Sequence, residues 1–504
     1  MAKTGSPVTK RISSSAAEGK TSRGIYLLIR GQILDGTLAA GAALPSTRAL
    51  AEDLAVSRST VTTVYEQLAA EGYLETQLGK RASVATGLSK QAATKAVAIR
   101  SGHLREVSAY GKRIAPYAAA TVSPVAIESL IDFQYGALAA LDFPLLAWRR
   151  AYNRMLVQRQ RWMAYDAPEG ERALRNALRG YLRRARGLQC DAEQIIIVQG
   201  SQQAIDLCAR VLVDPKDRVV VEDPCYAMAR RVFEAADAQV IALPVDGMGL
   251  DPRKLPAKRC KLAYVTPSHQ FPLGAVMPIQ RRKDLLAWAV AQHAWVIEDD
   301  YDGEFRYGMR PVDTLQSIDD SAGVIYVGTF SKALSPQLRM GYLVLPPDLV
   351  PLFREAKRLI DRHGPRQEQL VLASMIEDGS YERHVRRCRR LNEQRREALL
   401  KALEAHLHDA VDVDGAASGL HVVVWCAPIP ATAEAAFAAH AQAHGVGIRP
   451  LSPLYASAES PRQRPCAGYV LGYASISVKD IAEGVRRLAL ALKSFPRPAA
   501  SSRI

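Results

Sequence analysis

The 504-residue sequence lacks the features that mark membrane, secreted and disulfide-stapled proteins. No apolar run reaches the roughly 18 residues that a transmembrane helix needs, so we expect no membrane partner. The N-terminal segment MAKTGSPVTKRISSS is basic and Ser-rich without an apolar core, which argues against a secretory signal. The seven cysteines are scattered, with no Cys-x-x-Cys pair, which favours reduced thiols and predicts no metal site. We therefore expect a soluble, cytoplasmic protein.

Acidic residues are too few to balance the basic ones: 66 Lys and Arg face 51 Asp and Glu, which gives a net charge of +15. Residues 1–115 hold 16 basic and 8 acidic side chains, so this stretch alone carries +8. A basic excess is typical of proteins with an anionic partner, either nucleic acid or a membrane surface. Charge alone fits an ordinary solvated surface equally well, so the choice depends on local patterns.

Residues 21–86 show the pattern of three helices followed by two short strands, after a basic tail at residues 1–20 that we predict to be disordered. Apolar residues recur at helical spacing from Ile25 onward. A second helix is predicted to follow Ser46 as its N-cap, and a third to begin at Ser57. The two strands are expected at residues 73–76 and 81–85.

The third helix has the two faces of a DNA-recognition helix. The first residues of such a helix enter the major groove, so they are short, polar or basic, whereas the opposite face is apolar. Arg58 can bind a guanine edge or a phosphate, and Val61, Val64 and Leu68 face inward. The alternative is an ordinary helical subdomain with a solvated surface. The predicted DNA-contacting residues, which include one from the second helix and two from the wing, are Arg48, Ser57, Arg58, Ser59, Thr60, Lys80 and Arg81.

Residues 87–128 lack strong periodicity and are rich in Ala, Ser, Lys and Arg, which is typical of a linker. Over residues 129–495, short β-branched runs alternate with amphipathic helical stretches. This alternation predicts an α/β domain with a parallel sheet covered on both faces, and such sheets bind ligands at the carboxyl ends of their strands. The five predicted strands are residues 194–198, 218–221, 262–265, 295–297 and 324–327.

Polar residues follow three of these strands. Gly200-Ser201-Gln202 lies between a strand and a helix, where free N–H groups can hold a phosphate, although such a turn is commonplace by itself. Asp299 belongs to an acidic cluster, and a buried carboxylate there requires a cation such as a protonated pyridine nitrogen. Lys332 follows the next strand and can form a Schiff base. Together these residues favour a phosphate-bearing cofactor.

The segment LPSTRALAEDLAVSRSTVTTVYEQLAAEGYLETQLGKRASVA closely resembles the winged-helix domain of GntR-type transcription regulators. It carries their motifs Pro-Ser-x-Arg-x-Leu-Ala, Val-Ser-Arg-x-Thr-Val and Leu-x-x-x-Gly-Tyr-Leu. The resemblance covers residues 23–86 and implies double-stranded operator DNA as a partner.

From about residue 131 to 495 the chain resembles fold-type I pyridoxal-phosphate enzymes, the aminotransferases. The resemblance implies pyridoxal 5'-phosphate (PLP) as cofactor, held as a Schiff base by Lys332. Asp299 would keep the pyridine nitrogen protonated, and Tyr301 would contact the phenolic oxygen. The implied phosphate-binding residues are Gly200, Ser201, Gln202, Thr329, Ser331 and Arg339.

Three further residues match positions of that family. Tyr226 looks like the aromatic residue that stacks on the cofactor ring. His269 occupies the loop where ordinary aminotransferases carry an Asn near the phenolic oxygen. Tyr165 resembles the tyrosine that reaches the phosphate of the partner subunit, which implies a homodimer.

The motifs Glu-Asp-Asp-Tyr-Asp-x-Glu-Phe-Arg and Thr-Pro-Ser-His-Gln-Phe-Pro resemble the MocR/GabR-type regulators, in which a GntR winged helix is fused through a linker to an aminotransferase-like domain. The resemblance implies a PLP-binding transcription regulator that senses an amino acid, an amine or PLP itself. The alternative is a PLP-dependent aminotransferase with an accessory DNA-binding module.

The chain departs from this family where an effector carboxylate would bind. The amino-acid-sensing member carries an Arg two positions after the stacking tyrosine, where this chain has Met228. Arg449 is a second candidate for that role. Aminotransferases also carry an Arg just before the aromatic residue of the final strand, where this chain reads Tyr469-Val470-Leu471-Gly472-Tyr473. These departures argue against a GABA sensor and against efficient transamination, and Met228 favours PLP itself as the effector, since PLP has no carboxylate.

Overall fold

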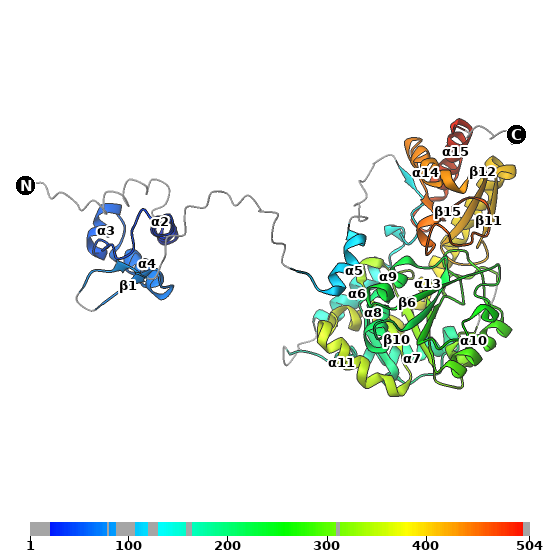
Figure 1. Cartoon of the computed structure of the whole chain (residues 1–504), viewed down its shortest axis with the longest axis horizontal. Helices are drawn as coiled ribbons and strands as arrows, with labels where there is room; N and C mark the ends of the chain where they lie inside the picture. Colours follow the sequence, from blue (N-terminus) through cyan, green and yellow to red (C-terminus); the bar gives the residue numbers. More distant parts are fainter. Residues whose placement is uncertain are drawn as a thin grey trace, which may run out of the picture. The chain divides into compact units, whose positions relative to one another are not determined.

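The computed structural model describes residues 21–77, 80–86, 106–118, 130–157, 164–308 and 313–496. The chain divides into two compact units, Met1–Glu106 and Val107–Ile504. Figure 1 shows the helices of the first unit in blue and the larger second unit in cyan to red. The predicted tail at residues 1–20 lies outside the described residues.

The first unit has the predicted three helices and two-stranded wing: α2 (Ser22–Leu34), α3 (Thr47–Leu54), α4 (Arg58–Ala70), β1 (Leu74–Glu75) and β2 (Ser83–Val84), with the strands antiparallel. The predicted N-cap Ser46 is confirmed, and Ser57, where the third helix was predicted to begin, is the N-cap of α4. The Ala49 N–H donates to Ser46 Oγ at 3.2 Å, and the Thr60 N–H donates to Ser57 Oγ at 3.1 Å. Residues 78–79, between the two predicted strands, lie outside the described residues.

A single apolar core holds this unit together. Val61, Val64 and Leu68 of α4 are completely buried, as the helical period of the sequence predicts. They pack in one cluster with Ile29 of α2 and Leu50 of α3. The helix therefore buries one face, which leaves its polar residues on the other.

The second unit is built on a seven-stranded sheet in the order β4-β10-β9-β8-β7-β5-β6. The strands are β4 (Ile195–Val198), β5 (Arg218–Asp223), β6 (Gln239–Pro244), β7 (Leu262–Val265), β8 (Trp295–Asp300), β9 (Val324–Thr329) and β10 (Gly341–Val344). All five predicted strands are present. Neighbouring strands run parallel except at β10, which is antiparallel to both β4 and β9.

The five predicted strands run in one direction, as expected for a parallel sheet, whereas the additional strand β10 runs opposite to them. Neither β10 nor the edge strand β6 was predicted. The four-residue run of β10 is too short for its period to distinguish a strand from a turn, and no local pattern encodes strand direction. Its antiparallel pairing places Gly341 opposite both Val198 and Thr329.

Helices cover both faces of this sheet, as predicted (Figure 1). On one face lie α8 (Ser201–Leu212), α9 (Ala227–Ala235) and α11 (Val350–Asp361). On the other lie α6 (Leu145–Leu156), α7 (Arg172–Arg186) and α12 (Arg366–Glu377). Ile195 and Ile196 belong to these opposite clusters because side chains alternate along a strand.

The C-terminal part forms a second layer of structure, drawn in yellow to red in Figure 1. The long helix α13 (Ser380–Leu407) leads into an antiparallel sheet in the order β11-β12-β15-β14. These strands are β11 (Val411–Asp414), β12 (His421–Pro430), β15 (Cys466–Gly472) and β14 (Arg449–Pro450), with α14 (Glu434–Ala443) and α15 (Val478–Ser494) in the same apolar cluster. A short parallel pair, β3 (Ile131–Asp132) with β13 (Val446–Gly447), ties the start of the domain to this part.

Part of the predicted linker is a helix of the second unit, α5 (Ala109–Ala118). Arg113 Nε donates to the Ala235 carbonyl at the end of α9 at 2.8 Å, and the Tyr117 hydroxyl bonds Glu234. The Arg231 guanidinium lies 4.8 Å from the centre of the Tyr117 ring. These polar contacts hold α5 against α9. Because the sequence of this segment has little apolar periodicity, its pattern predicts a linker and not a helix.

No helix in the described ranges is long and apolar enough to cross a membrane. All seven cysteines lie in those ranges and are unpaired thiols. The described residues contain no group of three or more His, Cys, Asp or Glu placed to hold a metal ion.

Candidate functional site

A cavity of about 180 Å³ lies where the carboxyl ends of β7, β8 and β9 meet, the edge at which such sheets bind ligands. Eight of the predicted cofactor residues line it: Ser201, Tyr226, Asp299, Tyr301, Thr329, Ser331, Lys332 and Arg339. The remaining wall is formed by Tyr135, Gly136, Tyr264, Thr266, Phe271, Asp302, Pro336, Leu420 and His421. The structure thus gathers residues that are spread over most of the second unit.

Lys332 lies in the turn after β9, and the backbone of Gly136 passes close to it. A Cβ atom at Gly136 would lie 3.1 Å from Lys332 Nζ. Burial lowers the pKa of the Lys332 amine, against the opposing effect of the Asp302 and Asp299 carboxylates. A lysine with a lowered pKa is more often neutral and nucleophilic, which is the state that Schiff-base formation requires.

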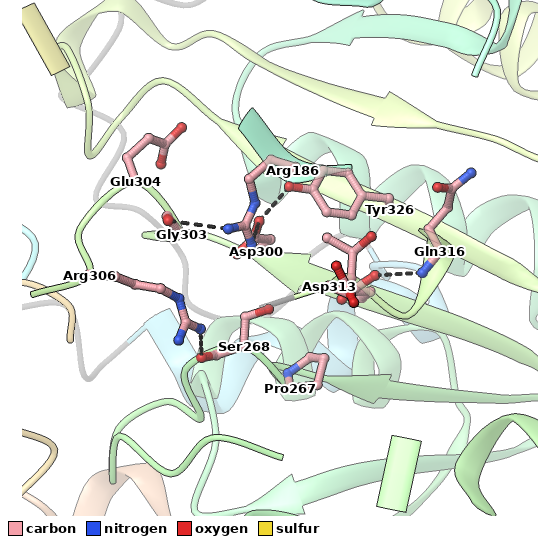
Figure 2. Close-up of polar contacts among 12 residues, drawn as sticks. Arg186, Pro267, Ser268, Asp300, Gly303, Glu304, Arg306, Asp313, Gln316 and Tyr326 are labelled. Carbon is pink, nitrogen blue, oxygen red and sulfur yellow. Dashed lines mark hydrogen bonds and ion pairs between the residues drawn. The ribbon is translucent and has the colours of Figure 1, made fainter. Parts of the chain in front are cut away.

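Alternation along β8 sends its consecutive acidic side chains to opposite faces of the sheet. Asp300 pairs with Arg186 and accepts a hydrogen bond from the Tyr326 hydroxyl, away from the cavity lining (Figure 2). Glu298, on the same side, accepts from the backbone N–H groups of Leu315 and Gln316 at 2.8 and 3.0 Å. Both carboxylates are therefore structural, which leaves Asp299 to face the cavity.

Asp299 is buried and only half satisfied. Its Oδ2 accepts a hydrogen bond from the Tyr264 hydroxyl at 2.7 Å, whereas Oδ1 is buried without a hydrogen-bond partner. Burial raises the pKa of Asp299 to about 7, although the Tyr264 bond opposes the rise. An unpartnered buried carboxylate oxygen is costly, and a cationic N–H donor at Oδ1 would remove that cost.

The opposite end of the cavity is suited to an anion. Helix α8 begins after Gly200, which has φ +81° and no capping side chain. The first N–H groups of a helix have no acceptor within it. Arg339 Nη2 donates to the Gln199 carbonyl at 3.0 Å, and a Cβ atom added at Gly200 would lie 3.1 Å from Arg339 Nη2. Only glycine lets the Arg339 guanidinium approach this helix end so closely, so positive charge converges here.

Aromatic side chains form one wall between these two ends. Tyr226 caps the start of α9, and its ring meets Phe271 edge to face at 6.1 Å between centroids. Phe271 also contacts Tyr301 and Tyr135, at 5.8 and 5.5 Å. Burial raises the pKa of Tyr226 to about 12, so this wall is neutral near pH 7.

His269, which the resemblance places near the phenolic oxygen, is not among the residues that line the cavity. Its Nδ1 lies 2.8 Å from Asp302 Oδ2 and 2.9 Å from the Tyr301 hydroxyl. An ionised carboxylate only accepts hydrogen bonds, so Nδ1 donates its single proton to Asp302. The Tyr301 hydroxyl then keeps its own proton for an acceptor in the cavity. His269 therefore acts on the site through Tyr301.

Four more predicted residues lie outside the cavity lining. Gly200 and Gln202 stand at the start of α8 beside the lining residue Ser201. Tyr165 is 71% exposed and lines a separate surface hollow, where Arg362 lies 3.9 Å from its ring centre. Arg449, on β14, donates to Asp132 at 2.6 Å and pairs across the sheet with Val470.

In the first unit, the predicted DNA-contacting residues gather at the start of α4 and on the wing. Arg58 and Ser59 are exposed on the first turn of α4, and Lys80 and Arg81 are exposed at the wing. Ser57 Oγ bonds the Ser59 and Thr60 hydroxyls at 2.8 and 2.7 Å as well as capping the helix. Arg48 is exposed and forms an ion pair with Glu52 at 3.1 Å.

Local patterns did not point to Tyr264, Asp302 or His421 as site residues. Tyr264 sits in a predicted strand two residues before Thr266, and Asp302 belongs to the recognised acidic motif, so the sequence carried a usable signal for both. His421 comes from β12, far along the chain, and no local pattern relates it to the cavity.

Two family models match the chain. Residues 21–84 match the bacterial regulatory proteins of the gntR family, and residues 128–469 match aminotransferase class I and II. Among curated proteins, the probable rhizopine catabolism regulatory protein MocR of Rhizobium meliloti is 37% identical over 92% of both chains. The pyridoxine biosynthesis regulator PdxR of Corynebacterium glutamicum is 33% identical over 79% of this chain and 82% of its own.

Solved aminotransferase structures share the fold of the second unit. The kynurenine aminotransferase of Pyrococcus horikoshii has a TM-score of 0.66 at 29% identity, covering 73% of this chain and 91% of that one. The α-aminoadipate aminotransferase LysN of Thermus thermophilus, complexed with N-(5'-phosphopyridoxyl)-L-leucine, has a TM-score of 0.65 at 28% identity, covering 73% and 92%.

A winged helix and an aminotransferase-type domain in one chain define a two-domain class of transcription regulator. The chain belongs to the MocR/GabR subfamily of the GntR-type regulators.

Proposed function

We propose that this protein binds PLP in the cavity of its second unit, binds double-stranded operator DNA through its winged helix, and couples the two in a cytoplasmic homodimer. The observation that carries the proposal is the buried, unpartnered Oδ1 of Asp299 in the same cavity as Lys332. Family membership supports the DNA-binding half.

The cavity residues fit PLP at each of its charged or reactive groups. Asp299 would accept from the protonated pyridine nitrogen, and Lys332 would hold the cofactor covalently. Ser201, Arg339 and the start of α8 would surround the phosphate, with Gly200, Gln202, Thr329 and Ser331. When bound, PLP supplies an aldehyde carbon that reacts with primary amines.

The chain's own residues would then fix the protonation of the site. The Tyr301 hydroxyl, whose proton is not needed by His269, would donate to the phenolic oxygen, while Tyr226 covers the ring. Asp302 holds His269 in one tautomer, which keeps Tyr301 a donor.

Two features support a homodimer. Tyr165 is exposed outside its own cavity, which suits the role, implied by the family, of reaching the partner's phosphate. Helix α6 also leaves Leu145, Leu146 and Leu156 at least 57% exposed, an apolar surface that a second copy would cover.

The effector is either a small amino-containing compound or PLP itself, and it must bind two states of the dimer differently to change DNA binding. An aminotransferase with an accessory DNA-binding module is less well supported, because Arg449 is paired with Asp132 outside the cavity lining.

The test is a visible absorption spectrum of the full-length protein, together with gel shifts on DNA upstream of its own gene, with and without PLP. We expect a visible band on addition of PLP and an operator affinity that differs between the two forms. Equal affinities for the PLP-free, PLP-loaded and amine-treated protein would overturn the sensing function. Rapid transamination without an operator footprint would favour the enzyme.

A further inference from the structure

The described cavity wall contains two cationic side chains, and both have a place in the proposed cofactor site. Lys332 is the lysine that would hold PLP, and Arg339 is drawn toward the start of α8 by its bond to the Gln199 carbonyl. No third Lys or Arg is among the residues that line the cavity in the described part of the chain. A carboxylate entering beside the cofactor would therefore meet no free cation from this wall.

Arg449, the arginine predicted to bind an effector carboxylate, already forms an ion pair within the chain. Arg449 Nη2 lies 2.6 Å from Asp132 Oδ2, and Asp132 is held in place because β3 pairs with β13. Burial raises the pKa of Tyr135, a lining residue, and the Arg449 charge opposes that rise. Arg449 is thus paired with Asp132 and is not among the residues that line the cavity.

The rest of the wall offers hydrogen-bond acceptors and apolar surface. His421 Nε2 lies 2.9 Å from the Pro272 carbonyl and must donate to it, so Nδ1 of the neutral ring is an acceptor. Burial lowers the pKa of His421 to about 4, which keeps the ring neutral at pH 7. Asp302 contributes carboxylate oxygens, and Phe271 and Leu420 are apolar.

We propose that the effector of this protein is a primary amine without a carboxylate group. Such an amine would present donors to Asp302 and His421 and place its body against Phe271 and Leu420. An amino acid would instead bring a further carboxylate to a wall that already holds Asp302 and whose described residues offer no Lys or Arg beyond Lys332 and Arg339, which is unfavourable in a partly buried site. This inference rests on the proposed function, because it takes PLP binding as given.

The test compares matched ligands on the PLP-loaded, full-length protein. The pairs are 2-phenylethylamine with L-phenylalanine, and n-butylamine with 4-aminobutyrate, each followed by titration calorimetry and by the shift in Tm. We expect at least one amine to bind about ten-fold or more tightly than its carboxylated partner. Equal or tighter binding of the amino acids would overturn the inference, and so would the absence of binding by both members of each pair.

The Asp132→Asn variant tests whether the ion pair between Asp132 and Arg449 is the reason why carboxylated ligands bind weakly. Removing this charge frees Arg449, so affinity for the carboxylated ligands is expected to rise several-fold while affinity for the amines stays unchanged. The matched control is Asp246→Asn, which breaks an ion pair with Arg281 outside the cavity lining. No gain in Asp132→Asn, or the same gain in the control, would remove the assigned role of the Arg449 and Asp132 pair.

Failure of the proposed function can be distinguished from failure of this inference. If the protein gains no visible absorption band with PLP, the proposed PLP binding is contradicted before any ligand is added. A chain that binds PLP and shifts its operator affinity, but binds both members of each pair equally, fails in the ligand class alone.

Discussion

The two units present helix N-termini of opposite kinds. In the first unit, Ser57 caps α4 with its own side chain, so the helix end is satisfied within the chain. In the second, Gly200 precedes α8 with no side chain at all, and the first N–H groups of that helix remain for another acceptor.

The difference matches what each end would contact. A self-capped helix can carry Arg58 outward to a DNA surface without needing an anion to complete it. The uncapped start of α8, with Arg339 beside Gly200, could satisfy its first N–H groups by binding an anion. In the proposed function, the N-terminus of α4 would serve as a rigid support for DNA contact and the N-terminus of α8 as a phosphate-binding end.

The largest expected effect is at the cofactor site. Lys332→Ala removes the amine that would hold PLP, so the visible absorption band should disappear completely. Operator affinity of the PLP-free variant should stay within about two-fold of the PLP-free parent, because the substitution lies in the other unit. Persistence of the band would show that another lysine holds the cofactor.

Next in size is the loss of the exposed arginine on α4. Arg58→Ala should weaken operator binding by about 5- to 100-fold, the range for a lost contact to a base or a phosphate. Gel-shift titration at fixed salt measures it. Arg23→Ala, which removes an equal charge from an exposed site on α2, is the control and should change affinity much less. Equal losses of operator affinity in the two variants would mean that Arg58 contributes only through its charge and not through a specific contact.

A smaller effect is expected from placing a side chain at the uncapped helix end. Gly200→Ala adds a Cβ 3.1 Å from Arg339 Nη2 at a φ of +81°, so PLP affinity should fall about ten-fold. Gly187→Ala is the control, since Gly187 has φ +70° with nothing within 4 Å of the added Cβ. Cofactor titration followed by absorbance distinguishes them, and an equal loss in both would implicate backbone strain alone.

The smallest effect concerns the self-capped helix. Ser57→Ala should cost about 1 kcal/mol in local stability, so amide hydrogens in the first turn of α4 should exchange about five-fold faster. Ser59→Ala is the control, because Ser59 Oγ bonds the Ser57 hydroxyl and caps no backbone N–H. Unchanged exchange in Ser57→Ala would mean that the Ser57 cap does not stabilise the first turn of α4.

The winged helix could be predicted closely because its determinants are local. The caps at Ser46 and Ser57 and the buried stripe at Val61, Val64 and Leu68 are all encoded within one or two helical turns. In the second unit the strands were found, but the reversed direction of β10 depends on pairing across the sheet, which local periodicity cannot encode.

For the cofactor site, the sequence by itself determined the family, the lysine and the acidic cluster, because motifs keep their residue types and order along the chain. Tertiary structure decided the contacts of the neighbouring carboxylates: Asp299, which the family resemblance already named, bonds Tyr264 in the cavity lining, whereas Asp300 pairs with Arg186 on the other side. It also decided that His269 contacts the Tyr301 hydroxyl without lining the cavity, and that Arg449 pairs with Asp132. Both outcomes depend on contacts between residues more than thirty positions apart, and their geometry exists only once the sheets have assembled.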